Sequence, residues 1–99
     1  MSKEPREFFE DKVGAQLLAF QDELEELDYR VENRGWESDI EIQQELMELG
    51  VKLKALRKDF QVLKTIPDQS WQLQKEDLEN ALQELSASIK DMISRLGPD

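Results

Sequence analysis

Residues 42–63 read IQQELMELGVKLKALRKDFQVL, in which a large apolar residue recurs alternately after four and three positions. These residues are Ile42, Leu46, Leu49, Leu53, Leu56, Phe60 and Leu63. Such spacing places their side chains along one line of an α-helix, which is the heptad pattern of a coiled coil. Ser38 and Glu41 have the spacing of a capping box, and Pro67 disfavours a longer helix, so we expect a helix over residues 39–65.

The segment before this helix has the same pattern. Its apolar line consists of Val13, Leu17, Phe20, Leu24, Leu27 and Val31. Pro5 suits a first helical turn, where its missing N–H has no cost, and Gly35 suits the left-handed conformation that ends many helices. The sequence therefore predicts a helix over residues 5–33.

A third apolar line follows Pro67. It consists of Trp71, Lys75, Leu78, Leu82, Leu85, Ile89, Met92 and Leu96, with Lys75 as its one charged member. Asp68 or Ser70 is the expected N-cap, and Gly97 with Pro98 ends the segment. We expect this helix over residues 69–96.

Three helices of similar length joined by short loops predict an all-α, antiparallel up-down-up three-helix bundle, with residues 1–99 as a single domain. Folding the hairpins back aligns all three apolar lines in one register, with Leu27 opposite Leu46 and Leu49 opposite Leu85. The same register predicts an aromatic cluster of Phe8, Phe9 and Trp71 at one end, and Trp36 near Ile93 and Leu96 at the other.

Two polar features have a structural explanation. Lys75 is expected to pair with Glu10 in a polar layer that fixes the register of the bundle. The basic cluster consists of Lys52, Lys54, Arg57, Lys58 and Lys64, and it lacks the interleaved aromatic residues of a nucleic-acid site. We expect Lys52 and Arg57 to pair across the helices with Glu23 and Glu79.

Composition argues against catalysis. The chain has no histidine and no cysteine, so it lacks the usual acid–base and thiol groups and the common zinc ligands. No glycine-rich phosphate loop is present. A pocket built from Lys and Arg is the remaining catalytic alternative, and the apolar lines leave little room for one. We expect no enzyme activity, no metal, no cofactor and no small-molecule substrate.

Charge and chain ends bear on partners and location. The net charge of −10 repels nucleic acid and anionic lipid, so neither is an expected partner. Residues 1–10 carry charges of both signs and no apolar core, which is unlike a secretory signal, and no segment has membrane-spanning length. A cytoplasmic protein is the simplest interpretation.

The second helix carries a further set of apolar residues outside its core line. Ile40, Met47, Val51, Ala55 and Val62 follow one another at intervals of seven, four, four and seven, which places them on one outward side, and Leu18 and Leu73 are candidates to extend the patch. The alternative is a broad core-facing arc that includes some of them. An outward apolar stripe predicts contact with another protein chain, such as the partner copy in a homodimer.

These features favour a non-catalytic interaction module, an adaptor, scaffold or regulator, that self-associates through its second helix. The alternative is an acidic inhibitor or decoy that binds a basic protein surface through Glu23, Glu25 and Glu26 on the first helix. Binding through these carboxylates would weaken with salt, whereas an apolar interface would tolerate salt.

Overall fold

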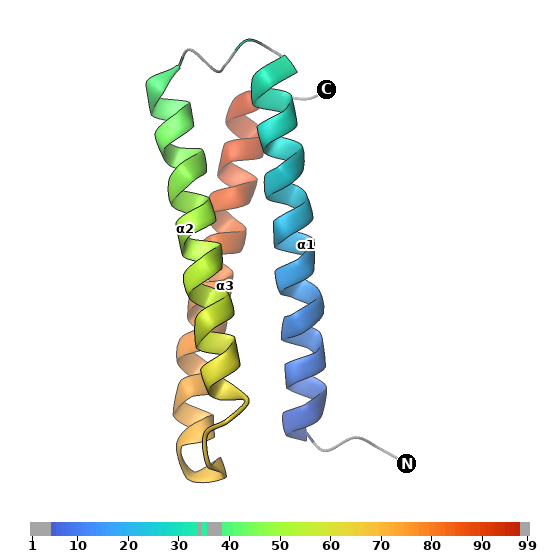
Figure 1. Ribbon diagram of the computed structural model, residues 1–99, viewed down its shortest axis with the longest axis vertical. Coiled ribbons are helices and arrows are strands. Elements are labelled where there is room, and N and C mark those ends of the chain that lie inside the picture. Colours follow the sequence, from blue (N-terminus) through green and yellow to red (C-terminus); the bar gives the residue numbers. More distant parts are fainter. Residues whose placement is uncertain (1–4, 34, 36–38, 98–99) are drawn as a thin grey trace.

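The computed structural model describes residues 5–33, 35 and 39–97, which form three α-helices (Figure 1). They are α1 (Pro5–Asn33), α2 (Ile40–Leu63) and α3 (Asp68–Leu96). The chain runs up along α1, down along α2 and up again along α3 in Figure 1, and each helix contacts both others. The predicted all-α three-helix bundle is confirmed. Within the described residues, no helix has the length and hydropathy needed to cross a membrane.

The helix ends agree with the sequence in part. Pro5 is the first residue of α1, and Gly35 and Gly97 have positive φ values of 76° and 80° after α1 and α3. The carboxylate of Asp39 caps α2 by accepting from the N–H of Ile42 at 3.2 Å. The predicted cap, Ser38, lies outside the described residues.

The other two predicted boundaries shift slightly. α2 ends at Leu63, two residues early, because the N–H of Thr65 donates to the carbonyl of Val62 in a tighter turn. α3 begins at Asp68, where the N–H groups of Ser70 and Trp71 donate to the carbonyl of Pro67 and no side chain caps the helix. Neither Asp68 nor Ser70 is therefore the cap that we expected.

Every buried residue in the described chain belongs to one of the three predicted apolar lines. The two exceptions within those lines are Leu24, which is half-buried and packs against the core, and Lys75, which is half-buried. Because these lines account for the whole core, the heptad spacing alone identified which side of each helix faces inward.

An aromatic cluster closes the end of the bundle where α1 begins. The rings of Phe9 and Trp71 meet edge to face with centroids 5.5 Å apart. The ammonium of Lys75 lies 5.3 Å from the Phe9 centroid and 5.7 Å from that of Trp71. Phe8 is 66% exposed and makes no ring contact with Phe9 or Trp71, contrary to our prediction. The predicted contact of Trp36 at the opposite end lies outside the described residues.

The predicted pair of Lys75 with Glu10 is wrong. The Nε of Arg6 donates instead to Glu10 at 3.1 Å, one helical turn along α1. Lys75 faces aromatic rings, whose negative faces attract a cation without requiring its burial beside a carboxylate.

Candidate interaction surface

The outer face of α2 exposes a row of apolar side chains. The exposed fractions are 71% for Ile40, 71% for Met47, 64% for Val51 and 50% for Val62, and Ala55 is also exposed. We name these five residues the α2 stripe. Val51 is two positions from Leu49 and Leu53 of the core, and two residues turn a helix by about 200°. The stripe therefore lies opposite the core, and the alternative of a broad core-facing arc is excluded.

Exposed apolar residues elsewhere do not form a comparable row. On α1, Phe8, Leu18 and Tyr29 are at least ten residues apart, which is about 15 Å along a helix. Leu18 lines the shallow groove between α1 and α2 with Phe60 and Gln61. Isolated apolar side chains are normal on a protein surface, whereas five on one side of a helix are unusual, and here Gln44 and Lys58 lie among them on the same side.

Charged residues divide α2 into two halves. Acidic side chains occur up to Gly50, and the basic cluster follows it, with Asp59 as the exception. Glu41, Glu48, Lys52, Lys54 and Lys58 are all exposed. No ion pair within 4.0 Å joins Lys52 or Arg57 to Glu23 or Glu79, so the predicted pairing is wrong. Lys52, Lys54 and Lys58 are exposed, Arg57 is half-buried, and the ammonium of Lys64 lies 5.1 Å from the centroid of the Phe60 ring.

The three carboxylates of the alternative acidic surface do not share one face. Glu23 and Glu26 line a small depression with Ile93 of α3, and Arg30 donates to Glu26 at 3.4 Å. Glu25 lies on the other side of α1, where it lines the groove toward α2 and accepts from Gln21 at 3.3 Å. A flat basic surface would therefore not meet all three carboxylates together.

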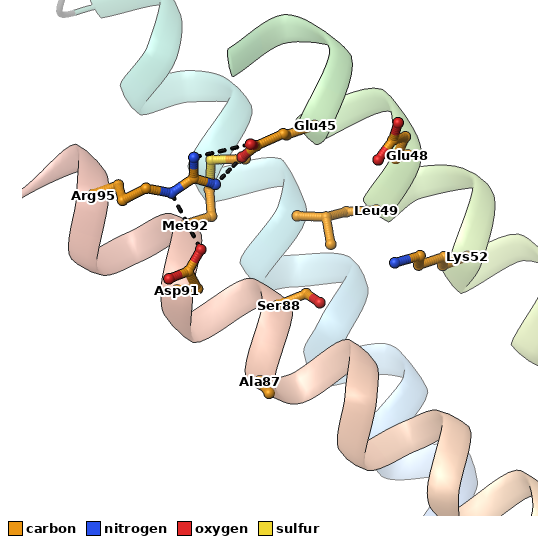
Figure 2. A pocket seen from close by; sticks show the side chains of 9 residues that line it. All are labelled: Glu45, Glu48, Leu49, Lys52, Ala87, Ser88, Asp91, Met92 and Arg95. Atoms are coloured by element: carbon orange, nitrogen blue, oxygen red, sulfur yellow. Dashed lines mark hydrogen bonds and ion pairs between the residues drawn. The ribbon is translucent and has the colours of Figure 1, made fainter. Parts of the chain in front are cut away.

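A groove of about 360 Å³ runs between α2 and α3 (Figure 2). Leu49 and Met92 form most of its apolar part, and Met92 lies seven residues, or about two turns, beyond the predicted partner Leu85. The guanidinium of Arg95 contacts both carboxylate oxygens of Glu45, and its Nη1 donates to Oε1 at 2.9 Å. The Nε of Arg95 lies 3.2 Å from Oδ2 of Asp91. Glu45 is thus engaged in joining the two helices, a role that the sequence analysis missed.

The described residues were also compared with the requirements of a metal site. The described residues contain no group of three or more acidic, histidine or cysteine side chains arranged to hold a metal ion. Glu41, Glu45 and Glu48 are close in sequence, but Glu45 is committed to Arg95.

Arg6 forms a second set of polar contacts between elements, at the end of the bundle opposite to Arg95. Its Nη2 donates to the carbonyls of Leu63 at 3.0 Å and Ile66 at 2.8 Å, and its Nη1 donates to Asp68 at 2.6 Å. The hydrogen bond to Asp68, helped by that to Glu10, raises the pKa of Arg6 although burial acts to lower it. Arg6 thus ties α1 to the α2–α3 turn. The sequence analysis did not identify this contact. The clue in the sequence was an arginine near the start of α1, at the end of the bundle where the last carbonyls of α2 lack helical partners.

Comparison with known proteins assigns no family. The chain matches no protein-family model, no curated protein and no solved structure. The functional argument therefore comes from the residues described above.

Proposed function

We propose that this protein is a non-catalytic helical interaction module that self-associates through the α2 stripe. The observation that carries the proposal is a row of apolar side chains about 33 Å long, on the outer face of a helix whose inner face is already buried. Covering such a row removes apolar surface from water, which is the main driving force of most protein association. A helical module that contacts another protein chain suits an adaptor, a scaffold or a regulator.

The location proposed for the module is the cytoplasm. The chain contains no cysteine, so its stability does not depend on an oxidising compartment. Expression of a tagged chain followed by fractionation of the cells tests this assignment, and recovery outside the cytoplasmic fraction would contradict it.

The first experiment measures absolute mass by light scattering after size exclusion. We expect twice the chain mass of 11.6 kDa, persisting from low to high salt because the contact is mainly apolar. The double variant Met47→Glu, Val51→Glu should give the monomer mass with unchanged helicity by circular dichroism.

A matched control adds a carboxylate at an apolar position on another helix. Phe8 is 66% exposed, close to the 64% of Val51, so Phe8→Glu should leave the mass unchanged. A monomeric wild-type chain at every concentration would contradict self-association. The acidic-decoy alternative would then be tested by salt-sensitive binding of the chain to a basic protein such as lysozyme.

A further inference from the structure

We infer that the self-association surface extends from the α2 stripe across the groove between α1 and α2, so that a second copy covers Leu18 of α1 as well as α2. The inference rests on the proposed self-association and adds the side of α2 toward which the contact widens. α2 has α1 as its neighbour on one side and α3 on the other (Figure 1), and the two sides differ in shape and in charge.

The α2 stripe alone offers less apolar area than a stable dimer needs. A fully buried side chain of this size removes about 60–120 Å² from water, so five of them supply at most about 600 Å². A specific interface of standard size buries about 800 Å² on each partner. In a dimer of that size, the remaining area comes from the surface beside the stripe.

On the side of α1, the stripe continues into two connected hollows. Met47 belongs to the stripe and also lines the larger hollow, of about 430 Å³, together with Leu24 and Gly50. Leu24 is the one apolar residue of the core lines that is only half-buried, and a Cβ on Gly50 would meet nothing within 4 Å. Arg57 lines both hollows, and Leu18 lines the smaller one. We name the two hollows together the α1–α2 groove, which gives apolar side chains of a second copy space beside the stripe.

Charge distinguishes this side of α2 from the side of α3. Five of the nine residues that line the groove toward α3 are charged, namely Glu45, Glu48, Lys52, Asp91 and Arg95. Only three of the fifteen residues that line the α1–α2 groove are charged, namely Glu25, Asp28 and Arg57. Covering a charged side chain removes its hydration, which costs free energy unless it finds a partner. A second copy therefore covers the side of α1 at a lower cost than the side of α3.

Two exposed leucines separate the two sides. Leu18 is 64% exposed and Leu73 is 69% exposed, and the sequence offered both as extensions of the apolar patch. Leu18 lines the α1–α2 groove, whereas Leu73 lies on α3. We therefore expect a second copy to cover Leu18 and to leave Leu73 in water.

A matched pair of substitutions tests this difference. Leu18→Glu and Leu73→Glu each add one carboxylate at a similarly exposed position, so they change the net charge equally. We expect Leu18→Glu to raise the dissociation constant of the dimer at least about tenfold, because the contact would cover the new charge among apolar groups. Leu73→Glu should leave the constant unchanged. Sedimentation equilibrium measures the constant, and circular dichroism confirms that each variant is folded.

A second pair repeats the comparison without added charge. Leu18→Ala should raise the dissociation constant several-fold, because it removes apolar area from the contact, and Leu73→Ala should not change it. These two variants decide the result if Leu18→Glu does not fold.

The remaining outcomes separate the two proposals. An unchanged dissociation constant for the Leu18 variants, with the Met47→Glu, Val51→Glu variant still monomeric, would overturn this inference and leave the proposed function standing. An equal loss of affinity for the Leu18 and Leu73 variants would also overturn it, because the contact would then reach α3. A monomeric wild-type chain would overturn the proposed function, and this inference with it.

Discussion

Arg6 makes contacts with four polar groups from three parts of the bundle. Its guanidinium, 24% exposed, hydrogen-bonds two backbone carbonyls and two carboxylates and lies 5.6 Å from the centroid of the Trp71 ring. The planar fork of arginine can satisfy several acceptors at once, which an ammonium group cannot do with the same geometry. Its raised pKa keeps the side chain charged, so this contribution is complete below the ordinary pKa of an arginine side chain and is lost only as pH rises through the raised pKa.

The first prediction concerns Arg6→Ala. Removing the guanidinium leaves the carbonyls of Leu63 and Ile66 without their donor, so the urea midpoint of unfolding should fall. Arg6→Lys should recover only part of the loss. Lys90→Ala removes an exposed charge on α3 and serves as the control. Equal midpoints for Arg6→Ala and Lys90→Ala would show that these contacts contribute nothing.

The second prediction contrasts two glycines. Gly35 has φ of 76°, where a side chain is strained, so Gly35→Ala should reduce the free energy of unfolding by about 1–2 kcal/mol. Gly50 lies within α2, and a Cβ there would meet nothing within 4 Å, so Gly50→Ala should increase it by about 0.5–1 kcal/mol. Chemical denaturation of both variants checks the opposite signs, and a shift in the same direction for both would contradict the explanation.

At the scale of elements, each helix divides cleanly between a core side and an outer side. On α3, Leu85 is 1% exposed while Leu73 is 69% exposed. A leucine therefore contributes much more to the free energy of folding on the core side than on the outer side, since only the buried side chain is removed from water on folding. α2 is unusual because its outer side is also partly apolar.

The third prediction uses this contrast on α3. Leu85→Ala should reduce the free energy of unfolding by about 2–5 kcal/mol, because it leaves a cavity in a packed core. Leu73→Ala should change it by no more than about 0.5 kcal/mol. Equilibrium denaturation with a shared m-value gives both numbers. A large loss for Leu73→Ala would indicate that this side chain is covered in solution.

At the scale of the whole molecule, ion pairs and hydrogen bonds connect the helices near both ends of the bundle. Arg95 with Glu45 joins α2 to α3 near one end, and Arg6 joins α1 to the α2–α3 turn at the other. Both sets of contacts pair an arginine with a carboxylate, and such pairs form strong, directional hydrogen bonds. α2 is therefore held near both of its ends, by Arg95 on Glu45 and by Arg6 on the carbonyl of Leu63.

By itself, the sequence determined the number of helices, their approximate ends and the side of each helix that is buried. These follow from local periodicity and from glycine and proline, which act over a few residues. It also placed the α2 stripe on one outward side but left a broad core-facing arc as the alternative, which the exposed side chains of the structure excluded.

Only the tertiary structure decided the polar contacts and the fine register. The sequence paired Lys75 with Glu10, but Arg6 takes Glu10 and Lys75 meets the rings of Phe9 and Trp71. Arg6 and Arg95 were missed because a long flexible side chain can reach acceptors several ångströms from its own position. Its choice depends on how the neighbouring helices are offset along their axes, and a heptad repeat leaves that offset uncertain by seven residues, or about two turns.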